Sequence, residues 1–189
     1  MKEQAGVKER IMETACRLFY QQGYQATGIN QIIEEAQIAK SSLYQHFASK
    51  ELLLNEYLET SRILWMTELA DFISGYADGI DKVLGFFDFR IHRLKNQEFK
   101  GCTFSRVVYE LPNLNESSTD IIKKHKLGIK EFIATQLLAI KSLPKQELDE
   151  TVNLIFNLAE GGVLQSTLFN TTQPLIDGKK ILVRLLKEI

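Results

Sequence analysis

Long apolar runs, disulfide frameworks and metal-ligand clusters are all missing from this sequence of 189 residues. No stretch comes near the roughly 18 consecutive apolar residues of a membrane-spanning helix, so no membrane partner is expected. The first residues include acids and show no apolar run before a small-residue cleavage site, which favours the cytoplasm over secretion. The only two cysteines, Cys16 and Cys102, are interpreted as small buried thiols of a reducing compartment. The three histidines show no ligand spacing with them, so no metal site is expected.

Catalytic and cofactor motifs are absent as well. There is no Gly-rich phosphate loop and no G-x-S-x-G nucleophile elbow. His46 lies near three serines in the sequence, but no acid in that window would orient it for catalysis. We therefore expect no enzymatic activity and no cofactor.

Neither sign of charge is in clear excess, because the formal net charge is only -1. Residues 1–60 hold six Lys/Arg against eight Asp/Glu, which gives no general basic signal for nucleic acid. The local placement differs, because no acid lies between Glu35 and Glu51 while Lys40, Lys50 and the titratable His46 do. A DNA-binding interpretation rests on this window, and its low charge predicts few phosphate contacts and a shallow salt dependence.

The periodicity of apolar residues is helical almost throughout, and no convincing alternating strand is present. It predicts an amphipathic first helix that begins near Val7 and ends at Gly23 in a left-handed C-cap. Two short helices follow, the first with Thr27 as its N-cap, and Ser49 caps a long fourth helix. Further helices are expected at 79–96, 102–111, 116–142, 147–170 and 174–188, with Pro112, Pro144 and Pro174 between them. The fold class is therefore all-α, with about nine helices.

Residues 25–50 carry the pattern of a helix-turn-helix, in which two short helices joined by a tight turn follow a longer one. Seven apolar residues would pack its small core: Ile29, Ile32, Ile33, Ala36, Ile38, Leu43 and Phe47. The second short helix then presents hydroxyls, an amide, an imidazole and a cation, from Lys40, Ser41, Ser42, Tyr44, Gln45 and His46. Such groups reach phosphates and base edges. The alternative is an ordinary corner between two helices, with Tyr44 and Phe47 as core aromatics.

A run of residues in this region resembles the tetracycline-repressor (TetR) family of regulators. It consists of Phe19, Gly23-Tyr24, Thr27, Ile29, Ile32, Ala36, Ser42-Leu43-Tyr44-x-His46-Phe47 and Ser49-Lys50-Glu51-x-Leu53, within a match over residues 7–55. The resemblance implies a three-helix DNA-binding domain at 1–50, with the helix-turn-helix near 28–47, and a ligand-binding and dimerisation domain at 51–189. It also implies that double-stranded operator DNA is contacted by Thr27, Lys40, Tyr44, Gln45, His46 and Lys50, and we count the outward Ser41 with them.

Two positions depart from the family pattern. Gln37 stands in the turn where the family usually has glycine. We therefore expect either a positive φ angle there, at some cost in energy, or a slightly different turn. Ala39 stands where the family often has a serine cap, which forgoes about 1 kcal/mol of capping. Both affect the fine geometry of the turn rather than the presence of the motif.

The C-terminal part resembles one branch of the family at Gly101-Cys102-Thr103-Phe104, at Glu110-Leu111 and at 160–164. The helix expected at 147–170 carries a stripe in which small residues permit close approach of another helix. Mainly because of the resemblance, we expect this stripe and the helix at 174–188 to form half of a four-helix homodimer interface. The interface residues are Ile155, Phe156, Ala159, Gly162, Val163 and Ser166. The alternative is that the stripe packs within one chain.

Aromatic residues are dense in the same part, and a helical domain lined by them would enclose a largely apolar small-molecule effector. The candidate pocket residues are Trp65, Phe86, Phe89, His92, Cys102, Phe104, Phe132 and Phe156. Ordinary core packing is the alternative for each aromatic. Cys102 lies near an expected helix start, where the helix dipole favours a thiolate, and is a candidate sensor of electrophiles or oxidants.

These patterns predict a homodimeric, sequence-specific DNA-binding transcriptional regulator. We expect a repressor that a small-molecule effector releases from its operator, by favouring a dimer state with a different separation of the two heads. Three alternatives stay open: a regulator that senses electrophiles or oxidants through Cys102, a helical ligand-binding protein without operator function, and activation in place of repression.

Overall fold

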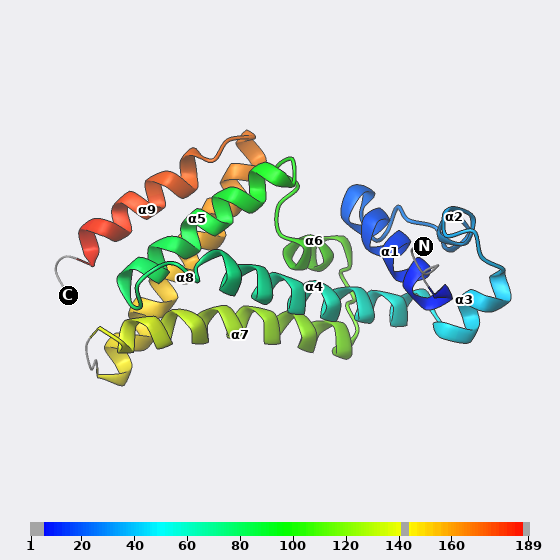
Figure 1. Cartoon of the computed structure of the whole chain (residues 1–189), viewed down its shortest axis with the longest axis horizontal. Helices are drawn as coiled ribbons and strands as arrows, with labels where there is room; N and C mark the ends of the chain where they lie inside the picture. The colour runs from blue at the N-terminus through cyan, green and yellow to red at the C-terminus, as the bar shows by residue number, and fades with distance from the viewer. Residues whose placement is uncertain (1–5, 141–143, 187–189) are drawn as a thin grey trace. The chain divides into compact units, whose positions relative to one another are not determined.

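The computed structural model describes residues 6–140 and 144–186. Over these residues the chain forms nine α-helices and no strand, which confirms the all-α prediction (Figure 1). They are α1 (Val7–Gln22), α2 (Ile29–Glu35), α3 (Lys40–His46), α4 (Lys50–Phe72), α5 (Ile80–Asn96), α6 (Thr103–Glu110), α7 (Glu116–Leu138), α8 (Lys145–Phe169) and α9 (Gln173–Leu185). The chain divides into two compact units, Met1–Ile63 with Thr103–Ile122 and Leu64–Cys102 with Lys123–Ile189.

The predicted spans agree with the observed helices apart from shifts at their ends. The span 116–142 ends earlier, at Leu138, and its residues 141 and 142 lie outside the described part of the chain. Residues 187 and 188 of the span 174–188 also lie outside it. Ser49 accepts a hydrogen bond from the N–H of Leu52 at 3.1 Å and caps α4 as predicted. Pro174 lies in the first turn of α9, where its missing N–H costs no hydrogen bond.

Two of the predicted caps differ from the structure, and both lie in the loop between α1 and α2. Gly23 ends α1 with a positive φ of 94°, but its ψ of 160° is extended rather than left-handed helical. The prediction that Thr27 caps α2 is wrong, because Gly28 is the N-cap and makes no side-chain hydrogen bond. The Thr27 hydroxyl instead donates to the carbonyl oxygen of Gly23 at 2.7 Å and closes the loop.

In the first unit, α1, α2 and α3 pack around a small apolar core that also includes the beginning of α4. The amphipathic period of α1 places Ile11 and Phe19 inside, and the Phe19 ring lies 5.3 Å from that of Tyr57 on α4. Of the predicted core residues of the helix-turn-helix, Ile32, Ala36, Leu43 and Phe47 are buried and Ile29, Ile33 and Ile38 are half-buried. This core fixes which side of α3 faces solvent.

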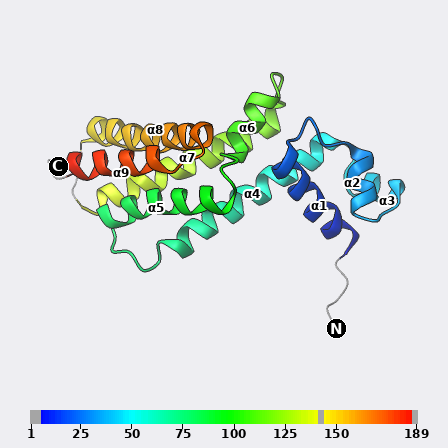
Figure 2. The same ribbon diagram turned by 90° about the horizontal axis from the view of Figure 1, so that it is seen from above.

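In the second unit, α5 packs against α8 and α9, and α8 lies alongside α9 (Figure 2). Phe86 and Phe87 of α5, Ile133 of α7 and Ile155 of α8 are fully buried in its core. Among the described residues, no helix combines the length and the apolar character needed to cross a membrane.

Candidate functional site

The polar side chains predicted to meet DNA lie on the exposed side of α3. Leu43 is fully buried there, while Lys40, Ser41, Gln45 and His46 are exposed and Tyr44 is 44% exposed. Tyr44 is therefore not a core aromatic. The alternative of an ordinary corner between two helices assumed that both Tyr44 and Phe47 are core residues, and this holds only for Phe47. Phe47 is buried as the residue after α3 and fixes its end to the core.

The turn between α2 and α3 has the geometry that the departures from the family pattern predict. Gln37 has a φ of 52°, so the first of the two alternatives, a positive angle at a non-glycine residue, is the one observed. Its carbonyl oxygen accepts a hydrogen bond from Arg10 of α1 at 3.3 Å. Ala39 is the N-cap of α3 and makes no side-chain hydrogen bond, as expected. The turn is thus held by backbone geometry and by Arg10 rather than by a capping side chain.

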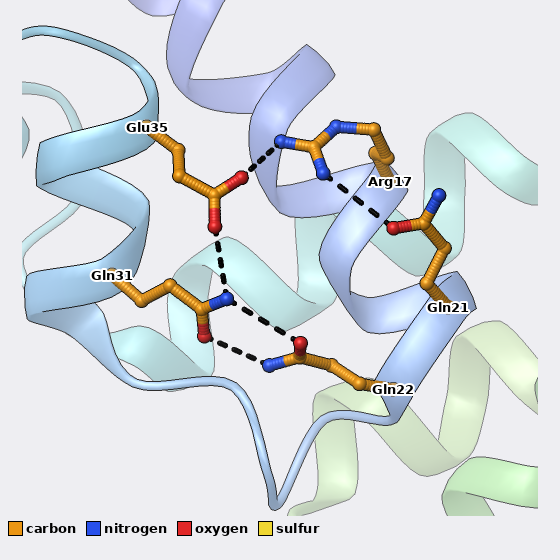
Figure 3. Close-up of polar contacts among 5 residues, drawn as sticks. All are labelled: Arg17, Gln21, Gln22, Gln31 and Glu35. Atoms are coloured by element: carbon orange, nitrogen blue, oxygen red, sulfur yellow. Dashed lines mark hydrogen bonds and ion pairs between the residues drawn. The ribbon is translucent and has the colours of Figure 1, made fainter.

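A network of long polar side chains, which the sequence analysis did not single out, braces α1 against α2 (Figure 3). Arg17 forms an ion pair with Glu35 at 2.5 Å and donates to Gln21 at 3.5 Å. Gln31 donates to Glu35 at 2.9 Å and accepts from Gln22 at 2.8 Å. Hydrogen bonding by Arg17, then by Gln31, lowers the pKa of the Glu35 carboxyl. The acid at the end of α2 is therefore matched by a cation, which removes part of the charge objection to DNA binding.

Thr27 and Lys50, the other two predicted DNA contacts, are engaged inside the first unit. Thr27 is fully buried and its hydroxyl is used by Gly23, so its side chain is not presented to an external phosphate. The Lys50 ammonium donates to the carbonyl oxygen of Tyr24 at 2.6 Å and lies 4.1 Å from the centroid of the Tyr24 ring. Burial lowers the pKa of Lys50, and the charge of Glu110 opposes this. Lys50 therefore holds the loop after α1.

α6 packs against the end of α1 through contacts that join residues more than 80 positions apart in the sequence. Arg106 donates to the carbonyl oxygen of Tyr20 at 2.7 Å and lies 3.7 Å from Glu110, its neighbour one turn later. The Glu110 carboxylate accepts from the N–H of Gln25 at 3.2 Å. Gly23 approaches that carboxylate so closely that a Cβ atom would lie 2.6 Å from Oε1. No local spacing signals these contacts, so the sequence analysis missed them.

In the second unit, the structure brings together a core of the predicted pocket residues. The Trp65 ring lies 6.3 Å from Phe86 and 5.1 Å from Phe89, and Phe132 lies 6.2 Å from Phe86. Cys102 and Phe156 are half-buried and pack against the same cluster. Two of the predicted pocket residues do not belong to this cluster. His92 is exposed and hydrogen-bonded to Asn96 at 2.8 Å, and Phe104 is buried in the first unit.

A charged cluster of the buried Arg90 and the half-buried Lys126 and Glu160, also missed from the sequence, lies beside these aromatic residues. Arg90 is 4% exposed and forms an ion pair with Glu160 at 2.8 Å, and Lys126 pairs with the other oxygen of the same carboxylate. Burial alone would raise the pKa of Glu160, but the two cations outweigh it and lower the pKa to about 2. The Arg90 guanidinium lies 5.8 Å from the Trp65 ring, and Lys126 donates to Cys102 Sγ at 3.5 Å. Polar and aromatic groups thus meet in one place.

The predicted dimer stripe on α8 is instead part of the core of one chain. Ile155, Ala159, Gly162, Val163 and Ser166 are all buried, and Phe156 is half-buried. A Cβ atom on Gly162 would lie 2.7 Å from Leu175, so the close helix approach that the small residues permit is that of α9. Five of the six residues are therefore covered within one chain, which is the alternative packing of this stripe stated above.

The opposite side of α8 and the outer side of α9 carry several exposed apolar side chains. The exposed apolar face of α8 and α9, as we name it, consists of Leu154, Leu164, Leu168, Phe169, Ile181 and Leu185. A groove of about 730 Å³ runs between the two helices and is lined in part by Leu154, Phe169 and Ile181. The sequence analysis singled out the buried stripe of α8 and did not single out this exposed one.

Comparison with known proteins agrees with this architecture. The family described as bacterial regulatory proteins, tetR family, matches residues 11–57. Two HTH-type transcriptional regulators of Bacillus subtilis are similar over nearly the whole chain: YxaF is 27% identical, with 93% of each chain covered, and LmrA is 26% identical, with 95% of this chain and 96% of LmrA covered.

Solved structures show the same fold. Escherichia coli NemR in its reduced form has a TM-score of 0.79 at 20% identity, over 93% of this chain and 95% of NemR. A TetR transcriptional regulator from Legionella pneumophila has a TM-score of 0.81 at 24% identity, over 98% of this chain and 99% of that regulator. With its helix-turn-helix, its all-α fold and these relatives, the chain belongs to the TetR family of DNA-binding transcriptional regulators.

Proposed function

We propose that this regulator is a repressor that binds operator DNA through α3 and is released by a small molecule. The observation that carries the proposal is the exposed polar side of α3, opposite the buried Leu43 and free of acids. Lys40, Ser41, Tyr44, Gln45 and His46 are the proposed DNA contacts. Thr27 and Lys50 are proposed to shape the head rather than to touch phosphate, because both are engaged within the first unit.

The proposed DNA-binding domain is 1–50 and the proposed ligand-binding and dimerisation domain is 51–189. We assign the dimer contact to the exposed apolar face of α8 and α9, because this face and its groove leave large apolar side chains in solvent. A two-fold axis would pair this face with itself. The two recognition helices then meet half-sites about 34–36 Å apart.

The effector is proposed to bind in the second unit, among the aromatic residues and the charged cluster. A largely apolar molecule with a polar group suits this place, because the aromatic side chains of Trp65 and Phe86 lie beside the charged groups of Arg90, Lys126 and Glu160. A ligand that binds one dimer state more tightly than the other weakens DNA binding by that difference in affinity.

A second candidate mechanism is covalent sensing of electrophiles at Cys102. The observation in its favour is the Lys126 ammonium 3.5 Å from Sγ of the half-buried thiol, where a cation stabilises the thiolate nucleophile. The thiolate sulfur would add to the β-carbon of an α,β-unsaturated carbonyl compound, and the electron pair of the C=C π bond would move to the α-carbon. That carbon would then take up a proton, which balances the proton lost by the thiol. Cys102→Ser should then abolish release of the protein from DNA by an electrophile. An unchanged response would rule this mechanism out.

The first experiment is a fluorescence-anisotropy titration against DNA from upstream of the protein's own gene, with random DNA as competitor and with salt varied. We expect sub-micromolar binding that survives the competitor, with two-fold symmetry in the protected site. Tyr44→Ala and Lys40→Ala should weaken the complex, whereas exposed Lys124→Ala in the second unit is the control and should not. If selection from a random DNA pool also yields no preferred sequence, the operator-binding proposal fails.

A further inference from the structure

The register of α3 decides which of its polar side chains reach furthest from the head. Leu43 is fully buried, so its direction defines the inward side of the helix. At about 100° of rotation per residue, Ser41 and Gln45 each lie within about 20° of the direction opposite Leu43. Both are exposed, and because they are four residues apart they share the outermost line of the helix.

The remaining polar residues of α3 lie on its flanks. Lys40 and Tyr44 share one flank, and Ser42 and His46 share the other, all at about 60–100° from Leu43. A helix in the major groove places its outermost line against base edges and its flanks near the phosphates on either side. The geometry therefore separates two candidates for base readout from four candidates for backbone contact.

The two outermost side chains differ in how well they discriminate between bases. The Ser41 hydroxyl both donates and accepts, so it pairs with most base edges. The Gln45 amide carries a carbonyl acceptor and an NH2 donor group at a fixed spacing. These groups match the N7 acceptor and the N6 amino donor that adenine presents in the major groove.

The Gln45 amide is also available to an external partner. Gln21, Gln22 and Gln31, the glutamines of α1 and α2, are held in the network of Figure 3. Within the described residues, Gln45 forms no hydrogen bond through its side chain and is exposed to solvent. Its replacement therefore removes no internal contact, so the folded head is retained in variants at this position.

We infer that Gln45 determines operator specificity at one position of each half-site, where its amide selects an adenine, and this inference rests on the proposed operator-binding function. Ser41 lies on the same line without imposing a base. Lys40 and Tyr44 contribute affinity for any sequence.

The test begins with selection of duplexes from a random DNA pool by the unmodified protein, which defines the half-site. Each base pair is then changed to the other three, and binding is measured by anisotropy for the unmodified protein, Gln45→Ala and Gln45→Glu. Replacement of the selected adenine should lower the affinity of the unmodified protein about 5- to 150-fold. The same replacement should change the affinity of Gln45→Ala little. Gln45→Glu should prefer cytosine at that position, because a carboxylate accepts from the cytosine amino group.

Two controls separate readout from general binding. Ser41→Ala removes a polar group from the same line one turn earlier and should keep the adenine preference. An adenine analogue without N7 should weaken the unmodified protein but not Gln45→Ala. If Gln45→Ala keeps every base preference, or loses affinity equally for all sequences including random DNA, the inference is wrong while operator binding stands. If the unmodified protein selects no sequence, the proposed function fails and this inference with it.

Discussion

The carboxylate of Glu110 accepts a hydrogen bond from the backbone N–H of Gln25 at 3.2 Å, and the side-chain amide of Gln25 donates to the Glu110 carbonyl oxygen at 3.3 Å. Glu110 is the last residue of α6, and Gln25 lies in the loop that leads into α2. These hydrogen bonds connect α6 to the loop before α2 within the same compact unit. A displacement of α6 would therefore displace the loop that positions α2.

Substitution of Gly23 tests how tightly this contact is packed. A Cβ atom at Gly23 would lie 2.6 Å from Glu110 Oε1, and its φ of 94° disfavours any L side chain. We expect Gly23→Ala to lower the free energy of unfolding by about 1–3 kcal/mol in urea denaturation. The double variant with Glu110→Ala should recover only the steric part of this loss.

Gly128→Ala is the matched control for this substitution, because nothing lies within 4 Å of the added Cβ atom in α7. It should raise the free energy of unfolding by about 0.5–1 kcal/mol. Equal effects of the two substitutions would contradict the close approach of Glu110 to Gly23.

The N-cap of α3 offers a stabilising substitution. Ala39 has the extended φ and ψ of −75° and 147° that suit a capping side chain, but it supplies no acceptor. Ala39→Ser should therefore raise the free energy of unfolding by about 0.5–2 kcal/mol, measured by thermal denaturation. Ala39→Val, which adds atoms without an acceptor, should give no gain. If serine and valine behave alike, the hydroxyl does not cap the helix.

The features that the sequence predicts correctly depend on short-range spacing. The exposed side of α3 follows from the burial of Leu43, and the positive φ of Gln37 follows from its place in a turn that usually requires glycine. Each needs information from only a few neighbouring residues. The local failures are the two caps in the loop between α1 and α2. Gly23 has a positive φ but an extended ψ. The Thr27 hydroxyl can either cap α2 or donate to the carbonyl oxygen of Gly23, and spacing alone does not decide between these.

The features that it misses depend on which helices meet. The charged cluster combines residues of three different helices, Arg90, Lys126 and Glu160. No local sequence motif therefore predicts it. The small residues Ala159 and Gly162 predict a close helix contact, but α9 of the same chain and a second subunit would satisfy that pattern equally. Only the packing shows that Leu175 fills the space beside Gly162.

The charged cluster predicts a dependence of stability on pH. The Glu160 carboxyl has a pKa of about 2 in the folded protein, against 4.5 for an ordinary glutamate. Because the folded-state pKa is lowered, its stabilisation is present above about pH 4.5 and is lost as the pH falls towards 2. The shift corresponds to about 3 kcal/mol. The free energy of unfolding should therefore fall across this range.

Glu160→Gln should remove most of that fall and should also lower stability at neutral pH, because it leaves Arg90 and Lys126 without a counter-ion. The control is Asp177→Asn, since Asp177 also has a lowered pKa but is exposed and screened by solvent. A parent-like acid transition in Glu160→Gln would show that other carboxylates dominate it.

The dimer assignment is tested by a charge on the exposed apolar face of α8 and α9. Leu168 is 74% exposed in the single chain, so Leu168→Glu should not disturb the fold but should oppose burial against a second subunit. Analytical ultracentrifugation should show a dimer for the parent and a shift towards monomer for the variant. Leu127→Glu, at an exposed site on α7, should remain dimeric. An unchanged Leu168→Glu dimer would place the interface elsewhere.

Lys40 tests whether a flank of α3 contacts the DNA backbone. It is exposed and lies one turn before Tyr44 on the same flank, so its removal should eliminate about one phosphate contact per subunit. We expect Lys40→Ala to weaken binding similarly for all sequences and to reduce the slope of log affinity against log salt by about 1 per half-site. Lys50→Ala should instead lower the stability of the head, because that ammonium is bound to the Tyr24 carbonyl oxygen. The slope of log affinity against log salt depends on the number of neutralised phosphates and not on the stability of the head. If Lys50→Ala changes this slope more than Lys40→Ala does, then Lys50 and not Lys40 is the phosphate contact.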